Sequence, residues 1–125
     1  MSINLESLKY NRNQIYPLAG YEFSPGAGLK VTSDTTLKAG RSWLILADTT
    51  AAPFSVFLPA APLEGNMFLI VDNGPNGSFA TNSLTIDGAG KSINGAGTLV
   101  LNANFAARLL RYNGTQWVVL HRGLA

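Results

Sequence analysis

The run LTIDGAGKSINGAGTLVL (residues 84–101) decides the fold, because it predicts strands joined by tight turns rather than a strand followed by a helix. Apolar and polar residues alternate over 84–87, as on a half-buried strand. The pairs Asp-Gly at 87–88 and Asn-Gly at 94–95 are typical of hairpin turns. An extended apolar run resumes at 98–101. The stretch therefore predicts short strands and turns in succession.

The segment GAGKS (88–92) also resembles the end of a phosphate-binding loop, and this alternative fails on two requirements. The loop needs an earlier glycine at the position that Thr85 occupies here. It also needs a helix after the serine, so that backbone N–H groups meet the phosphates. Residues 93–97 hold two glycines and an asparagine, which do not start a stable helix. We therefore predict turns around a short strand at 91–93, and no nucleotide site.

From Leu29 onward the sequence predicts β-structure throughout, and no window shows helical spacing with caps. The apolar run at 66–72 suits a strand buried on both faces. Asn113-Gly114 predicts a two-residue hairpin between the last two strands. Many short strands separated by turns are typical of an all-β sandwich or barrel. The predicted fold is a compact antiparallel β-sandwich over 29–125, jelly-roll-like or barrel-like. Its expected strands are 36–48, 53–59, 66–72, 83–87, 91–93, 98–102, 104–112 and 115–122.

Residues 1–28 differ from the rest of the chain and predict an extended N-terminal arm. Prolines and glycines in this segment oppose both helix and central strand. The segment is nevertheless rich in large apolar groups, which disordered linkers usually lack. One interpretation is that the arm packs along its own domain. The sharper one is that it docks on another protein. The candidate partner-binding residues are Tyr10, Ile15, Tyr16, Leu18, Tyr21 and Phe23.

The composition indicates one domain and excludes several classes of protein. Charged residues make up 13% of the 125 residues, about half the usual share, so Ser, Thr, Asn and Gly must cover the surface, or other chains must. The scattered basic residues form no stripe for nucleic acid. Without cysteine there is neither a disulfide nor a thiolate metal site. No apolar run is long enough for a signal-peptide core or a bilayer span, so we expect no membrane association.

Candidate catalytic and metal-binding residues are few. A Ser-His-Asp site would have to use His121, the single histidine, which we expect at a strand end near solvent. A glycosidase needs two carboxylates that face one cleft, and nothing in their spacing singles out a pair. The run at 72–78 lacks the alternating acidic ligands of a calcium loop. We expect turn roles for most of the acidic residues, no enzyme, no metal and no cofactor. The acidic residues are Glu6, Glu22, Asp34, Asp48, Glu64, Asp72 and Asp87.

Three short motifs carry a resemblance to a known family. They are LPAAP (58–62), TIDG (85–88) and YNGTQW (112–117), set within a similar region from about Val31 to Leu120. This pattern resembles a β-domain of tailed-bacteriophage virion proteins, found in tail fibres, tailspikes and capsid decoration (cement) proteins. The resemblance implies a homotrimer, which agrees with the low charge. Fibre proteins usually carry a long shaft before this domain. Because the sequence starts at Met1 and has only 28 residues there, we expect the chain to be complete without one.

The resemblance implies a structural virion protein on the capsid surface. The favoured function is a trimeric decoration protein that binds the major capsid protein through its arm and stabilises the phage head. The alternative is a trimeric receptor-binding tip of a tail fibre, which recognises a host glycan or protein. An enzyme acting on surface polysaccharide is a more distant third. A decoration protein should hold its partner contacts in the arm, whereas a receptor binder should hold them in loops far from it.

Overall fold

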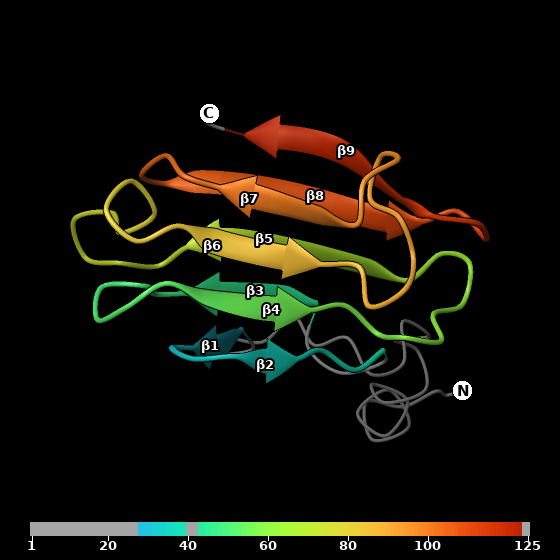
Figure 1. The fold of residues 1–125 in the computed structure, drawn as a ribbon, viewed down its shortest axis with the longest axis horizontal. Coiled ribbons are helices and arrows are strands. Elements are labelled where there is room, and N and C mark those ends of the chain that lie inside the picture. The colour runs from blue at the N-terminus through green and yellow to red at the C-terminus, as the bar shows by residue number, and fades with distance from the viewer. Residues whose placement is uncertain (1–27, 40–42, 124–125) are drawn as a thin grey trace, which may run out of the picture.

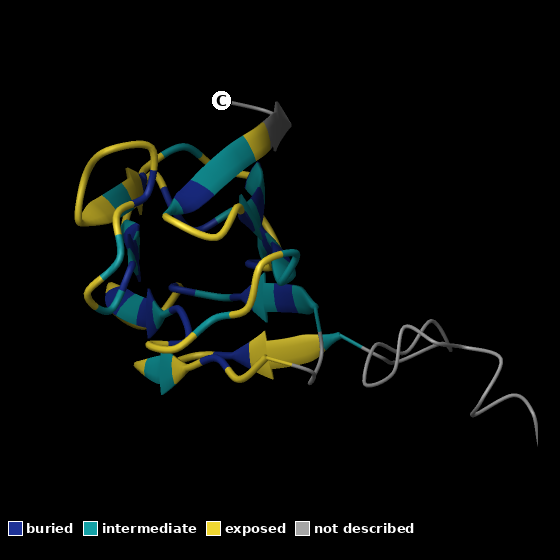
Figure 2. Ribbon diagram, turned by 90° about the vertical axis from the view of Figure 1, so that its right-hand side faces the viewer, coloured by how far each residue is buried: buried dark blue, intermediate teal, exposed yellow. Residues whose placement is uncertain are grey.

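A computed structural model describes residues 28–39 and 43–123, and for 121–123 it describes the backbone alone. The described residues form nine strands and no helix. The strands make two sheets that lie face to face (Figures 1 and 2). The all-β prediction is therefore confirmed for this part of the chain, and the two-layer arrangement is that of a sandwich.

The two sheets share the chain unequally. Sheet A has the strand order β1-β3-β5-β8-β9, and sheet B has the order β2-β4-β6-β7. The first six strands alternate between the sheets, so that the chain winds through three turns of a flat coil, and β7, β8 and β9 close it. The strands of sheet A are Leu29–Val31 (β1), Leu44–Ala47 (β3), Met67–Asp72 (β5), Ala106–Tyr112 (β8) and Trp117–Gly123 (β9). Those of sheet B are Thr35–Thr36 (β2), Phe54–Phe57 (β4), Leu84–Asp87 (β6) and Thr98–Leu101 (β7).

The predicted antiparallel arrangement is wrong, because both sheets are mixed. Strands β1, β3 and β5 pair in parallel, as do β2, β4 and β6. Antiparallel pairing is confined to β5–β8, β8–β9 and β6–β7. The cause is the path of the chain, which crosses to the opposite sheet after each of the first five strands. When it comes back to a sheet it runs in the same direction as before, so the neighbouring strands pair in parallel. The sheets are not closed into a barrel, and a jelly roll would need antiparallel Greek keys. The barrel-like and jelly-roll-like alternatives are therefore wrong as well.

The core lies between the sheets and is filled by the inward residue of each alternating pair. In β5 the burial pattern alternates strictly, so Phe68 and Ile70 point inward. Trp117 has no exposed surface, and its ring centroid lies 5.8 Å from that of Phe68 and 5.3 Å from that of Tyr112. These separations are within the range of favourable aromatic pairs. The aromatic cluster joins β5, β8 and β9 on the inner side of sheet A.

Two predicted strands differ from the structure. The segment 36–48 contains the end of β2 and all of β3 rather than one continuous strand. The segment 91–93 is not a strand, because Ile93 makes only isolated bridges to Ala96 and Trp117. Ile93 is nevertheless buried, so its apolar side chain serves the core from within a loop.

Of the two turns predicted between β6 and β7, the one at Asn94-Gly95 is confirmed, and the other lies one residue later than predicted. Asn94 and Gly95 both have positive φ, as a type I′ turn requires. Before them, the tight turn is centred on Ala89 and Gly90, one residue later than the predicted Asp-Gly centre, and the N–H of Lys91 closes it on the Gly88 carbonyl. The segment GAGKS is thus a turn, and no helix follows it in the described chain.

The predicted two-residue hairpin at Asn113-Gly114 is wrong. Tyr112 pairs with Trp117, which leaves a four-residue loop between β8 and β9. Gly114 has a φ of 98°, whereas Asn113 is not in the positive-φ region. The Asn113 side chain gives the reason, because its Oδ1 accepts the N–H groups of residues 115 and 116, both at 2.9 Å. Asn113 thereby stabilises the longer loop as an Asx turn.

Candidate interaction surface

The outer face of sheet A, here named face A, is almost entirely apolar. Its middle row consists of Leu44 on β3, Leu69 on β5 and Leu109 on β8, which lie in register on neighbouring strands. All three are half-buried and alternate with inward core residues. Side chains in register on one face of a sheet have Cβ atoms about 4.5–5.5 Å apart. The three leucines therefore form a continuous strip across the sheet.

Two further rows flank the leucines and enlarge the apolar surface. Among the described side chains of face A, the charged ones are Arg111 in one row and Lys30 beside the other. Both lie away from the leucine row, so the described side chains at the centre of face A carry no charge. One flanking row contains Leu46, Val71 and Ala107, and the other contains Met67, Arg111 and Val118.

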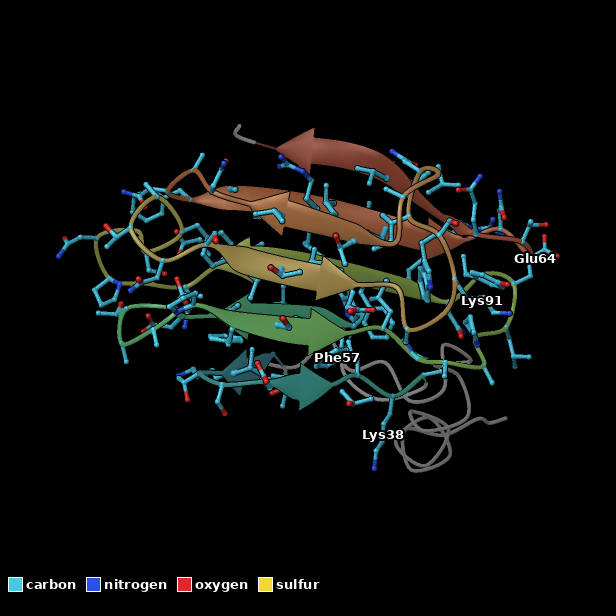
Figure 3. All side chains as sticks on the ribbon, in the orientation of Figure 1. Lys38, Phe57, Glu64 and Lys91 are labelled. Carbon is cyan, nitrogen blue, oxygen red and sulfur yellow. The ribbon has the colours of Figure 1, made fainter. Side chains whose placement is uncertain are left out.

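The outer face of sheet B, here named face B, has the opposite chemistry. Its side chains are mainly hydroxyl-bearing, and Val100 on the edge strand is 49% exposed. Figure 3 labels Phe57 on this sheet, an aromatic side chain among polar neighbours. Hydroxyl-bearing side chains are thus four of the seven outward residues of face B, whereas eight of the nine residues in the rows of face A are apolar. The two rows of face B are Ser55, Thr85 and Val100, and Thr36, Phe57, Asp87 and Thr98.

No third layer of described chain covers face A, because all nine described strands belong to the two sheets (Figure 2). Gly28, the first described residue, lies against this face. A Cβ added to Gly28 would come within 2.8 Å of Leu46 Cδ1 and 3.3 Å of Leu44 Cδ2. The chain therefore enters sheet A beside the apolar surface.

At one end of the sandwich, the buried carboxylate of Asp72 organises the loops. Its Oδ2 accepts the backbone N–H groups of Ser78 (2.7 Å), Phe79 (3.1 Å) and Phe105 (2.9 Å). Its Oδ1 accepts the N–H of Gly74 (2.9 Å) and the hydroxyl of Ser78 (2.8 Å). Burial alone would raise the pKa of Asp72, but the four N–H groups outweigh it and hold the pKa below its ordinary value of 3.8.

Thr49 and Asn82 extend this network to another loop. The N–H of Thr49 donates to Ser78 Oγ at 3.0 Å, and the Asn82 side-chain amide donates to the Thr49 carbonyl at 2.9 Å. The Thr49 hydroxyl donates to the Asn82 carbonyl at 2.5 Å. These hydrogen bonds join Thr49, Asp72, Ser78, Asn82 and Phe105, so the network holds several loops together.

Two of the remaining aspartates of the described chain, Asp48 and Asp87, make the local turn bonds predicted from the sequence, whereas Asp34 bonds to the distant strand β4. Each accepts a backbone N–H near a loop or strand end, as Asp side chains commonly do. These acidic groups therefore act singly on the backbone. The pairs are Asp34 with Ser55 at 2.9 Å, Asp48 with Thr50 at 2.8 Å, and Asp87 with Ala89 at 2.7 Å.

The other residues considered for chemistry are dispersed. Glu64 and Lys91 come from two different loops (Figure 3). His121 lies in β9 opposite Leu109, and its side chain is outside the described part. Within residues 28–39 and 43–120, no group of three His, Cys, Asp or Glu side chains could hold a metal ion. The described residues also include no helix long and apolar enough to cross a membrane.

The predicted partner-binding residues of the arm lie outside the described residues, so the arm interpretation stays a prediction. They are Tyr10, Ile15, Tyr16, Leu18, Tyr21 and Phe23. The sequence interpretation missed face A, although the continuous apolar run at 66–72 carried the signal. That run indicates a strand with two apolar faces, and the structure places one of them in the core and the other on face A.

No protein-family model matches the chain, and a search of curated proteins finds no match.

Proposed function

We propose that this protein is a structural, non-enzymatic component of a bacteriophage virion. In this proposal it is a capsid decoration protein, which binds the major capsid protein on the shell surface as a homotrimer and is anchored by its N-terminal arm. The observation that carries the proposal is the unequal chemistry of the two outer faces. A sandwich with one apolar outer face suits a protein that works in an assembly, because soluble monomers rarely leave large apolar patches uncovered.

The low charge of the chain supports the same proposal. Ser and Thr supply four of the seven outward side chains of face B, which keeps that side compatible with water. Face A has no such cover among the described residues. The resemblance of the turn and core motifs to phage virion β-domains gives the class of assembly.

The arm supplies the physical means of attachment. Ordering a backbone residue costs about 1–2 kcal/mol, so an irregular segment gains little by folding alone. Burying a large apolar side chain on a partner returns about 1.5–3 kcal/mol, and the proposed anchors are Tyr16, Tyr21 and Phe23. A ligand that binds only the assembled shell stabilises it by mass action. Three arms on one trimer raise the effective concentration for each successive contact.

Co-sedimentation with capsids tests the proposal. Deleting residues 1–28 should leave a folded β-domain with its oligomeric state intact, and this variant should no longer sediment with shells. A matched full-length variant with Tyr16, Tyr21 and Phe23 changed to Ala should bind at least tenfold more weakly. Wild-type occupancy by the truncated protein would place attachment on the β-domain, whereas failure to fold would assign the arm to the core. Electron microscopy of intact particles should show the protein on the shell, and density at a tail-fibre tip would contradict the proposal.

A further inference from the structure

We propose that Phe105 and its neighbour Asn104 form a binding site for a neutral oligosaccharide. The two residues lie at the end of the sandwich where Asp72 organises the loops. This site goes beyond the proposed function, because attachment to a capsid through residues 1–28 does not use these loops.

Phe105 has a backbone conformation that phenylalanine rarely adopts. The N–H of Ala106 donates to the carbonyl of Ala103 at 3.2 Å, so residues 103–106 form a tight turn. Phe105 is the third residue of this turn and has a φ of 62°. Turns with positive φ at this position usually carry glycine or asparagine there, and a bulky residue is strained. Strained residues of this kind are concentrated at binding and active sites, where the surrounding structure holds them in place.

The side chain of Phe105 contributes little to the core. It is 49% exposed, whereas Phe68 and Phe79 are 1% and 0% exposed. A single exposed apolar side chain is common on protein surfaces, but one that also strains its own backbone is not. The combination of strain and exposure indicates contact with another molecule.

The loop that follows β5 holds both residues in place. The N–H of Phe105 donates to Asp72 Oδ2, and the N–H of Ala80 donates to Asn104 Oδ1, both at 2.9 Å. A Cβ added to Gly77 would lie 2.5 Å from Asn104 Cβ, so the two loops are in direct contact. Because Ala80 uses the amide oxygen of Asn104, its Nδ2 group is left as a donor that no described residue accepts. An aromatic side chain and a placed polar donor on a rigid backbone are typical of ligand sites.

The loops around the pair carry amide and hydroxyl groups but no charge. The segments 73–83 (NGPNGSFATNS) and 102–105 (NANF) contain no charged residue and five asparagines. Asparagine amides donate and accept hydrogen bonds, as sugar hydroxyl groups require, and an aromatic ring offers an apolar surface for sugar C–H groups. A phosphate or a carboxylate would need a cationic partner, which these loops lack. The chemistry therefore favours a neutral sugar, and the exposed asparagines are Asn73, Asn76, Asn102 and Asn104.

The position of the site leaves it apart from the start of the described chain. Strands β1, β3 and β5 run in the same direction, and Asp72 is in register with Ala47, which pairs with Val31 at the end of β1 (Figure 1). The loops at Asp72 therefore lie at the end of sheet A toward which β1 runs, and the described chain enters β1 at its other end.

Binding of the full-length protein to immobilised oligosaccharides tests this assignment. The probes are neutral oligomers of glucose, galactose, mannose and N-acetylglucosamine, with sialylated oligosaccharides for comparison. At least one neutral probe should bind the parent, and Phe105→Gly should weaken that binding about tenfold or more. Asn104→Asp keeps the acceptor for Ala80 but loses the donor, so it should weaken binding as well. The matched control is Leu63→Ala, which removes a 72% exposed apolar side chain from another loop and should bind as the parent does.

Urea unfolding separates a ligand contact from a structural role of the ring. Glycine adopts positive φ freely, so relief of strain in Phe105→Gly offsets the loss of a half-exposed side chain. The unfolding midpoint of Phe105→Gly should therefore stay close to that of the parent.

Four outcomes would overturn the assignment, and they separate it from the proposed function. If no neutral probe binds the parent, or only sialylated probes bind, the ligand class is wrong. If Phe105→Gly binds as the parent does, the sugar site lies elsewhere. If Phe105→Gly unfolds at a much lower urea concentration or does not fold, and Asn104→Asp binds as the parent does, the two residues are structural. If Phe105→Gly loses co-sedimentation with capsids, these loops contact the shell and their ligand is a protein.

Discussion

Replacing Asp72 with Asn should destabilise the fold strongly at neutral pH. The carboxylate accepts four backbone N–H groups and one hydroxyl, and Asn keeps a single acceptor oxygen. If the amide oxygen takes the Oδ2 position, it retains the bonds from Ser78, Phe79 and Phe105. The amide nitrogen then faces the N–H of Gly74, which loses its acceptor. An orphaned buried donor costs about 1–3 kcal/mol, and the three retained bonds lose the strengthening that an ionised acceptor gives. The expected loss is about 2–4 kcal/mol.

The parent protein should also lose stability in acid through the same carboxylate. The pKa of Asp72 in the folded state lies below its ordinary value of 3.8, so well above 3.8 the carboxylate is ionised in both states and its contribution is constant. As the pH falls toward and through 3.8, the unfolded state takes up the proton first, and the free energy of unfolding decreases. The contribution is gone once the pH has passed through the folded pKa. Asp72→Asn should lack this part of the acid dependence.

Urea unfolding at a fixed protomer concentration measures the effect, because association makes stability depend on concentration. The matched control is Asp87→Asn, in which the retained oxygen can still accept the single N–H of Ala89, so it should lose less than about 1 kcal/mol. If Asp72→Asn unfolds within about 0.5 kcal/mol of the parent, or loses no more than the control, the carboxylate does not organise these loops.

Three further predictions concern the turns. Gly88→Ala should destabilise the fold by more than about 2 kcal/mol in urea unfolding, since the added Cβ would lie 1.9 Å from the Lys91 carbonyl oxygen and the backbone would have to move; an unchanged midpoint would contradict the close approach. Gly114→Val should cost about 1–3 kcal/mol because of the positive φ, whereas Gly97→Val, in open space and outside that region, should cost less than half as much. ATP with magnesium should give no heat beyond dilution in calorimetry, and a saturable signal lost on Lys91→Ala would overturn the assignment of GAGKS to a turn.

Local features of the fold could be predicted from the sequence, because they depend on neighbouring residues. Alternation in the segment 84–87 identified a strand with Leu84 and Ile86 inside. Asn94-Gly95 indicated a turn with two positive φ angles, which the structure confirms. Asn113-Gly114 has the same composition and forms a longer loop, since the Asn side chain there bonds two backbone N–H groups instead. The same pair can therefore have two outcomes, depending on whether the Asn side chain bonds to the backbone N–H groups that follow it.

The parallel pairing could not be predicted, because it depends on residues far apart in the chain. In sheet A, Ile45 pairs with Leu29, 16 positions earlier, and with Ile70, 25 positions later. The unequal spacing leaves no period in the sequence. Short alternating strands fit parallel and antiparallel partners equally well, so the pattern determined which residues face inward but not which strand lies alongside.

The low charge of the sequence left two alternatives open, a polar uncharged surface or cover by other chains. Face B has the first kind of surface, and face A has the chemistry that the second requires. The leucine row shows why the candidate surface escaped prediction: Leu69 lies in an apolar run that indicates burial on both sides, and the run does not reveal which molecule supplies the second side.

The winding of the first six strands has a consequence for how this protein could change in evolution. Each turn adds one strand to each sheet, and the connections between turns already differ in length. A duplication that inserts one whole turn would preserve the inward and outward pattern of every other strand. It would widen each sheet by one strand, about 4.8 Å in the direction of the interstrand hydrogen bonds, and leave the closing strands β7, β8 and β9 unchanged. The width of the two sheets can therefore change in steps of one strand, as in solenoid proteins, without redesign of the core.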